Sequence, residues 1–405
     1  MKQKRIPSVR FIEYSDEWAK TKLNKIAEIV GGGTPDTKQS SYWNGDINWF
    51  SPTEVGKTVY LTKSEKTISQ LGLQKSSAKL LPAFKTILFT SRAGIGDVGI
   101  LTEDSTTNQG FQSLVVNEGT DVYFLYSYSD QIKKYALKHS AGSTFLEISG
   151  KELGKMDLSI PSLPEQNSIG SLFRTLDDLL VSYKENLANY QSLKATMLSK
   201  MFPKVGQKVP EIRLDGFEGE WEVKELGDVV KFYSGLTYKP SDVLSCGTLV
   251  LRSSNVRDGE LIYIDNVFVN PDIVNCQNVK SGDIVVVVRN GSRDLIGKHA
   301  LIRTEMLNTV IGAFMTGVRC DNPEFINALL DTKMFISEIH RNLGSTINQI
   351  TTGNFKRMKF YFPLKDEQQA IGKYFTNLDN LISSHQEKIS QLETLKKKLL
   401  QDMFI

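Results

Sequence analysis

The feature that most constrains the fold of this chain is an internal duplication. The stretch that begins at Gly142 and the stretch that begins at Gly344 match without a gap for about sixty residues, at a constant shift of 202 residues. The matches include a Gly-Ser-Thr triplet, a Glu-Gln pair and a final Met-Phe pair: Gly142–Thr144 with Gly344–Thr346, Glu165–Gln166 with Glu367–Gln368, and Met201–Phe202 with Met403–Phe404. A period near 200 residues is too long for a solenoid, so we expect two copies of one domain, each followed by one helix.

A second, shorter repeat opens each half at a shift of 203 residues. Arg10 and the Glu17-Trp18 pair match Arg213 and the Glu220-Trp221 pair. Between these anchors the two halves differ strongly, and each shows strand-length β-branched and aromatic runs with one or two short helices. We therefore predict an α/β fold class, with two mixed α+β domains related by an internal pseudo-two-fold repeat.

Each half ends in a stretch that predicts one long helix. From Glu165 to Met201 there is no proline and no glycine after Gly170, and Ser162 and Glu165 have the spacing of a capping box. Apolar residues recur at heptad spacing, which predicts an antiparallel coiled coil of about 55 Å. The residues expected at the helix-pair or partner interface are Ile169, Phe173, Leu176, Leu180, Leu187, Ile371, Phe375, Leu378, Ile382 and Ile389. The alternative is that these helices pack only on their own domains.

Both variable regions contain a strand, an arginine, a glycine-bearing turn and a second strand, in that order. Arg92 follows the strand 85–91 in the first region, and Arg289 ends the strand 283–289 in the second. Arginine can form two hydrogen bonds with guanine, and Asn or Gln can form two with adenine. Lysine and backbone N–H groups can bind phosphate. The candidate DNA-binding residues are Ser91, Arg92, Gly94, Asn108, Gln109, Gln112, Arg289, Asn290, Ser292, Arg293 and Lys298.

The overall charge balance makes any DNA-binding surface a local one. Lys and Arg total 49 and Asp and Glu total 46, which leaves a net charge of +3. The segment 289–303 carries four cationic residues against the single acidic Asp294, so it is locally basic. The alternative is a solvated loop with scattered charges, which the recurrence of the turn in both halves makes less attractive.

In this order of anchors, variable regions and helices, the chain resembles the specificity subunit of type I restriction-modification systems. The resemblance covers nearly the whole chain and implies target recognition domains at residues 1–160 and 204–362. It implies conserved spacer helices at residues 161–203 and 363–405. Each domain would read one half of a split site in double-stranded DNA, with half-site centres roughly 10 bp apart.

The resemblance also implies partners and a division of labour. The helices would set the spacer and dock two modification (methyltransferase) subunits, which carry S-adenosylmethionine and methylate adenine. Restriction/translocase subunits would join through the complex. The chain itself would be a non-catalytic cytoplasmic protein without a cofactor.

The residues support the absence of a catalytic or metal site. Gly94, Gly96 and Gly99 have the spacing of a dinucleotide-binding loop, but the residues that follow predict a strand instead of a helix. No P-loop is present, and the four histidines are far from one another and from the cysteines. No apolar run is long enough to span a membrane.

Two other functions stay open at this point. The first is a helical-hairpin interaction scaffold with two protein-binding domains and no DNA role. The second is a self-contained DNA methyltransferase, which the missing motifs disfavour.

Overall fold

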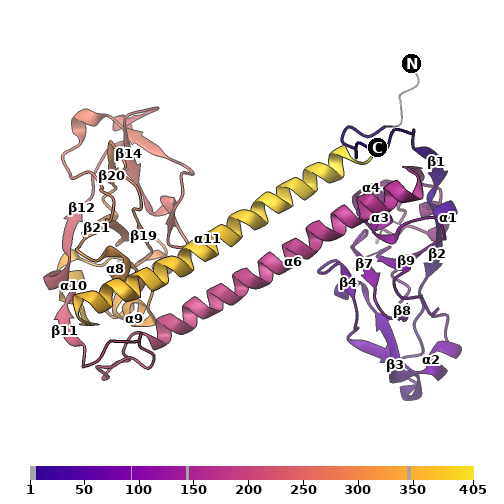
Figure 1. The fold of residues 1–405 in the computed structure, drawn as a ribbon, viewed down its shortest axis with the longest axis horizontal. Coiled ribbons are helices and arrows are strands. Elements are labelled where there is room, and N and C mark those ends of the chain that lie inside the picture. Colours follow the sequence, from indigo (N-terminus) through magenta and orange to yellow (C-terminus); the bar gives the residue numbers. More distant parts are fainter. Residues whose placement is uncertain (1–5, 93, 143–145, 344–347) are drawn as a thin grey trace. The chain divides into compact units, whose positions relative to one another are not determined.

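The computed structural model describes residues 6–92, 94–142, 146–343 and 348–405. It divides into two compact units: residues 1–184 with 387–405, and residues 185–386. Each unit contains one mixed α/β domain and segments of both long helices, α6 (Leu163–Lys200) and α11 (Lys365–Asp402) (Figure 1). The division into units therefore cuts across the two sequence repeats.

The first domain contains a five-stranded and a three-stranded sheet. In spatial order, the strands of the larger sheet are β2 (Ala27–Gly31), β9 (Gln112–Val116), β6 (Thr86–Phe89), β7 (Val98–Leu101) and β4 (Tyr60–Leu61). Those of the smaller sheet are β5 (Lys66–Ile68), β3 (Trp43–Phe50) and β8 (Ser105–Thr107). The helices are α1 (Leu23–Ile26), α2 (Gln70–Gln74), α3 (Val122–Ser127), α4 (Ser129–His139) and α5 (Gly150–Leu153).

The second domain contains two four-stranded sheets and a short hairpin, β15 (Val256–Arg257) and β16 (Glu260–Leu261). One sheet has the order β12 (Lys231–Ser234), β21 (Met315–Arg319), β18 (Ile284–Val287) and β19 (His299–Leu301). The other has the order β13 (Val243–Leu244), β17 (Val267–Val269), β14 (Thr248–Leu251) and β20 (Thr309–Ile311). The helices are α7 (Leu226–Val229), α8 (Pro323–Leu330), α9 (Lys333–Asn342) and α10 (Thr352–Arg357).

The main sheets of the two domains share one antiparallel core. The order β2-β9-β6-β7 in the first domain corresponds to β12-β21-β18-β19 in the second. Strands β6 and β18 are buried at every position, which explains their continuous apolar sequences. The structure confirms the predicted pair of mixed α/β domains.

A small two-stranded sheet lies at the start of each long helix. Strand β1 (Ala19–Lys22) pairs with β10 (Asp157–Ile160), and β11 (Glu222–Glu225) pairs with β22 (Lys359–Phe362). Each sheet joins the residues after the Glu-Trp anchor to the residues just before α6 or α11. This pairing explains why the two sequence anchors, far apart in each half, are repeated together.

The repeated glutamate at the start of each helix holds the N-terminal anchor. Glu165 is buried and accepts hydrogen bonds from Arg10 Nε at 2.7 Å and Trp18 Nε1 at 3.3 Å. The predicted capping box with Ser162 is therefore wrong, because the Glu165 carboxylate faces the anchor instead of its own helix end. This arrangement also explains why Leu364 can replace the serine in the second copy.

The apolar face of each long helix begins inside the core of a domain. Ile169, Phe173 and Leu176 pack with Trp18 and Phe124, whereas Leu180 is buried and Leu187 is half-buried. In the second unit, Ile371, Phe375 and Leu378 pack in the domain core, and Ile382 and Ile389 are half-buried. These positions therefore pack against their own domain, and the same two cores also contain Leu399 of α11 and Met197 of α6. Their place at a helix-pair or partner interface stays a prediction.

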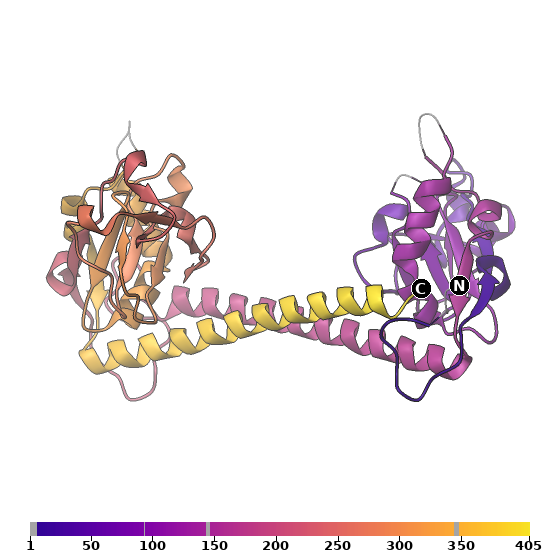
Figure 2. The same ribbon diagram turned by 90° about the horizontal axis from the view of Figure 1, so that it is seen from above.

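The end of one helix completes the domain that the other helix begins. Phe404, after α11, contacts the rings of Trp18, Phe124, Tyr128 and Phe173 in the first unit. In the second unit, Phe202 after α6 contacts Trp221, Phe325 and Phe375. The repeated Met-Phe pair is therefore a core element, and Figure 2 shows the end of α11 beside the first domain.

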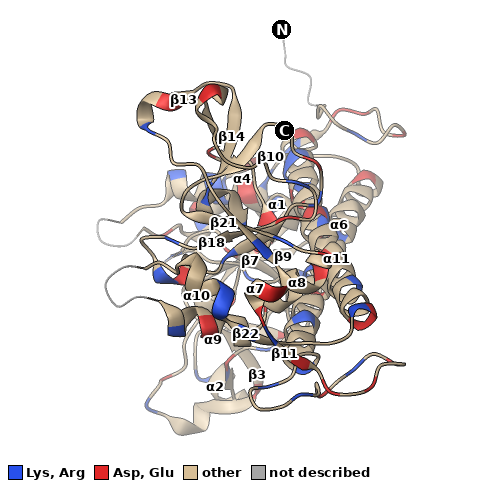
Figure 3. Ribbon diagram, turned by 90° about the vertical axis from the view of Figure 1, so that its left-hand side faces the viewer, with Lys and Arg blue, Asp and Glu red and all other residues tan. Residues whose placement is uncertain are grey.

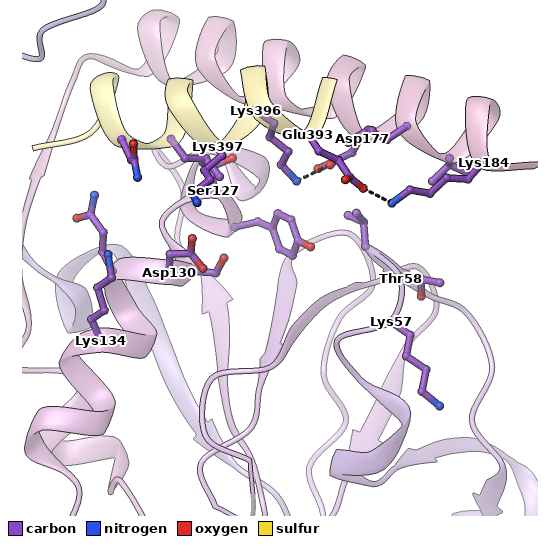
Figure 4. Close-up of a pocket in the computed structure, with 18 of the residues that line it drawn as sticks. Lys57, Thr58, Ser127, Asp130, Lys134, Asp177, Lys184, Glu393, Lys396 and Lys397 are labelled. Carbon is purple, nitrogen blue, oxygen red and sulfur yellow. Dashed lines mark hydrogen bonds and ion pairs between the residues drawn. The ribbon is translucent and has the colours of Figure 1, made fainter. Parts of the chain in front are cut away.

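Within each unit the two long helices run in opposite directions and are joined by ion pairs. In the first unit, Lys396 pairs with Asp177, and Lys184 pairs with Glu393 at 2.7 Å (Figure 4). In the second, Lys194 pairs with Asp379 at 2.7 Å. The Lys396–Asp177 and Lys194–Asp379 pairs are the same contact at a shift of 202 residues.

Candidate nucleic-acid interface

The turn that contains Arg92 connects the antiparallel strands β6 and β7. The Thr90 hydroxyl donates to the Gly94 carbonyl at 2.6 Å and accepts from the Asp97 amide at 2.9 Å. Gly94 has a φ of +128°, a conformation that favours glycine. Because an antiparallel strand follows, the structure confirms that the glycine spacing here is not a dinucleotide-binding loop.

Polar residues of the loop 108–110 gather beside Arg92. The Gly110 amide donates to the Asn108 side chain at 2.7 Å, and a Cβ built on Gly110 would lie 3.6 Å from Arg92 Nε. The Thr34 hydroxyl donates to Gln109 Oε1, so the Gly-Gly-Gly-Thr segment 31–34 borders the same surface. Arg92, Asn108 and Gln109, predicted together from the sequence, are therefore neighbours in the structure.

In the second domain, the turn after Arg289 is held by neighbouring loops. Asn290 Nδ2 donates to the Ser253 hydroxyl at 3.1 Å, and its Oδ1 accepts from the Ser292 amide at 3.0 Å. Asn348 Nδ2 donates to the Gly291 carbonyl at 2.9 Å. Asn290 is therefore partly used in fixing the turn, whereas Ser292 and Arg293 are exposed.

The two turns are equivalent by their backbone contacts. Arg92 forms an antiparallel bridge with Glu147, and Arg289 forms one with Gln349, 202 residues further along from Glu147. These bridges bring each turn to the C-terminal side of the repeated Gly-Ser-Thr motif, confirming the predicted correspondence of Arg92 and Arg289. Residues 143, 144 and 344–346 of that motif lie outside the described residues.

Accessibility separates the predicted residues. Ser91 is fully buried and its hydroxyl has no hydrogen-bond partner among the described residues, so it cannot reach DNA in this conformation. Gln112 and Lys298 are half-buried, and Lys298 Nζ donates to the Val256 carbonyl at 3.2 Å. Arg92 is half-buried, whereas Gly94, Gln109 and Arg289 are exposed.

The arginines of the two turns keep their hydrogen-bond donors available. Arg92, Arg289 and Arg293 form no side-chain hydrogen bond or ion pair with another described residue, whereas Arg303 pairs with Glu260 at 3.3 Å. Arg289 instead lies over the ring of Phe314, with Cζ 4.9 Å from the ring centroid. Elsewhere the charges are mixed, and Figure 3 shows both signs along α6 and α11.

Three residues that border the two turns were not among the predicted DNA-binding residues: Thr34, Ser253 and Phe314. Their signals were weak, because each comes from a loop far from its arginine in the sequence. Only the Gly-x-Thr triplets at 32–34 and 235–237 offered a repeated pattern.

The described ranges contain no group of three or more His, Cys, Asp or Glu side chains placed to hold a metal ion. None of the helices described is both long enough and apolar enough to span a bilayer.

Comparison with known proteins gives a family match in both halves. A model of the type I restriction modification DNA specificity domain matches residues 15–189 and again residues 218–394. The MjaIX specificity subunit of a type I restriction enzyme from Methanocaldococcus jannaschii is 32% identical over 229 residues, which cover 54% of this chain and 53% of that protein. The chain thus matches about half the length of this relative.

Two further likenesses extend the comparison. The EcoR124I/EcoR124II specificity subunit from Escherichia coli is 31% identical over 186 residues, covering 44% of this chain and 45% of that protein. The crystal structure of a type I restriction-modification S subunit from M. genitalium superimposes with a TM-score of 0.65, at 16% identity and with 99% of both chains covered. At that identity, the structural likeness shows a shared fold.

Proposed function

Since this chain belongs to the type I restriction modification DNA specificity family, we propose that its two domains read the two halves of a split sequence in double-stranded DNA. The observation that carries this proposal is the repeated arginine turn. Arg92 and Arg289 occupy equivalent places in two domains of different sequence, and neither forms an ion pair with a described residue. An arginine fork with free N–H groups suits the paired acceptors of guanine or a phosphate.

Each domain supplies its own set of polar groups to this reading surface. Arg92, Gly94, Asn108, Gln109 and the half-buried Gln112 serve the first half-site. Arg289, Asn290, Ser292, Arg293 and Lys298 serve the second half-site. Base-edge contacts give sequence preference, whereas lysine and backbone N–H contacts to phosphate give affinity that falls with salt concentration.

The helices α6 and α11 act as an antiparallel coiled coil that sets the gap between the half-sites and docks two modification subunits. The repeated ion pairs Lys396–Asp177 and Lys194–Asp379 support the antiparallel register. Four leucines at repeated positions remain between 40% and 46% exposed, as expected for two equivalent docking surfaces: Leu179, Leu193, Leu381 and Leu395. Methylation, with S-adenosylmethionine, and cleavage belong to the partner subunits, and this chain is not itself an enzyme.

The deciding experiment compares the methylation motif of cells that carry Arg92→Ala, Arg289→Ala or the unchanged chain. Each substitution should relax base preference in one half-site only, at a cost of about 1–3 kcal/mol in discrimination. Arg257→Ala is the matched control, since Arg257 is exposed and its side chain has no described partner. Unchanged motifs and DNA affinity in both variants would favour the protein-binding scaffold instead.

A second experiment tests the spacer. Inserting about one heptad at the middle of both helices should lengthen the required gap and leave the bases of each half-site unchanged. A change in base preference would contradict the separation of reading from spacing.

A further inference from the structure

The two arginine turns are equivalent in backbone but differ in the residue that faces the arginine. In the first domain, the Ser91 amide donates to the Gly110 carbonyl at 2.8 Å. In the second, the Val288 amide donates to the Phe314 carbonyl at 3.0 Å. Gly110 and Phe314 therefore occupy the same place beside Arg92 and Arg289.

Phe314 holds Arg289 from two sides. The Arg289 amide donates to the Phe314 carbonyl at 3.2 Å, and the guanidinium Cζ lies 4.9 Å from the centroid of the ring. A guanidinium over an aromatic face keeps its N–H edge free, so it can still donate to a bidentate acceptor. The ring restricts the arginine without using its donors.

The first domain has no room for the same arrangement. A Cβ on Gly110 would lie 2.8 Å from Pro52 Cγ and 2.9 Å from Asn108 Oδ1, so a larger side chain would collide with the loop. Arg92 therefore has no ring at the equivalent position. The aromatic ring of Phe314 therefore restrains Arg289 in the second domain, whereas no ring restrains Arg92 at this position in the first.

The exposure of Phe314 also needs an explanation. The side chain is 52% exposed, although its neighbour Met315 is buried in the core. An exposed phenylalanine contributes little to folding, and here its described ring partner is the arginine of the proposed reading surface.

From this contrast we propose that Phe314 is a positioning residue that orients Arg289 toward a guanine of the second half-site, through the O6 and N7 acceptors in the major groove. This proposal rests on the proposed function and adds two points to it. The base that Arg289 reads is guanine, and Phe314 is the residue that orients Arg289. Arginine loses much rotamer freedom when it binds, and a ring that already restricts it lowers that entropic cost. No such effect is expected in the first half-site.

The test uses the full chain assembled with its modification subunits and a pool of random double-stranded DNA. Phe314→Leu should lower the preference for guanine at one position of the second half-site about two- to five-fold, the fold-change that corresponds to a cation–π contact of about 0.5–1 kcal/mol. Phe314→Tyr should restore it, since the ring is kept. Leu307→Ala, which is 87% exposed in the same unit, should change nothing.

A double substitution separates positioning from a merely structural role. In the Arg289→Ala background, Phe314→Leu should have no further effect on base preference, because it acts through Arg289. An additive effect, a change in the first half-site, or an unchanged preference in Phe314→Leu would overturn the inference. If the unmodified complex selected no sequence, the proposed function itself would fail. If Arg289→Ala relaxed the second half-site and Phe314→Leu did not, only this inference would fail.

Discussion

Arg213 forms a bidentate salt bridge with Glu367 at the start of α11, with Nε 2.8 Å from Oε1 and Nη2 2.7 Å from Oε2. Glu367 is only 1% exposed, and Arg10 and Glu165 form the matching pair in the first unit. The pair joins the opening anchor of each half to the helix that ends it. Its burial distinguishes it from the many exposed ion pairs of this chain.

The substitution Glu367→Gln should destabilise the second unit by about 3–5 kcal/mol, because it leaves a nearly buried guanidinium without its counter-charge. Hydrogen-exchange protection in each unit is the measurement, since it reports the two units separately. The control is Glu222→Gln, which removes an exposed pair with Lys224 and should cost under about 1 kcal/mol. Equal losses from both substitutions would show that burial of the pair does not matter.

The aromatic residue after each long helix gives a second prediction. Phe404→Ala should cost the first unit about 3–5 kcal/mol, because it opens a cavity among four aromatic rings. The measurement is chemical denaturation, monitored by hydrogen exchange of the amides near Trp18, which reports the loss of stability in the first unit. The adjacent Ile405→Ala is the control, since Ile405 is 42% exposed. An unaltered first unit in Phe404→Ala would disprove the role of the helix end in that core.

A third prediction concerns the contact of the first domain with α6. The Tyr123 hydroxyl donates to Asp177 Oδ2 at 2.7 Å, and burial together with this bond raises the pKa of Tyr123. Tyr123→Phe should destabilise the first unit by about 1.5–3 kcal/mol, the range for a hydrogen bond to a charged group. Tyr126→Phe, on the same short helix, should have almost no effect, because its hydroxyl has no described hydrogen-bond partner. Thermal unfolding of both variants compares them directly, and a similar loss in each would contradict this assignment.

The sequence was most informative where the pattern is local. Heptad spacing between Gly170 and Pro203 predicts a helix over 165–201, and the structure has it at Leu163–Lys200. The strand, arginine, turn and strand order likewise identified Arg92 and Arg289 as equivalent. Both features depend on neighbours within a few residues, so one sequence suffices to find them.

Features that depend on distant contacts could not be predicted in the same way. Phe173 has the heptad position of an interhelical residue, but it lies in a domain core that contains Trp18 and Phe124 together with Phe404 from the end of α11. Glu165 has the spacing of a helix cap, but its carboxylate accepts hydrogen bonds from Arg10 and Trp18. Phe314 faces Arg289 only because of the register of β18 and β21.

The last prediction concerns a buried histidine that only the second domain has. His299 on β19 lies opposite Val286, where the first domain has Val98 opposite Phe89. Its Nδ1 is 3.0 Å from the Gly297 carbonyl, and its Nε2 is 3.3 Å from Asp331 Oδ1, in an ion pair and not a well-aligned hydrogen bond. Asp331 also accepts from Lys194 of α6 at 2.6 Å.

Burial alone would lower the pKa of His299, but the Asp331 carboxylate outweighs burial and raises it above the ordinary value of 6.5, against the opposing charge of Lys194. A raised pKa in the folded state means that protonation stabilises the second unit fully below about pH 6.5, and that this stabilisation is lost as the pH rises through the folded-state value. Thermal unfolding of the second unit between about pH 5.5 and 8.5, with a ring-proton titration by NMR, should show this loss. His299→Val should abolish it, and the first unit, with Val98 in this place, is the internal control. A second unit whose stability rose over the same range would mean that the buried ring is neutral.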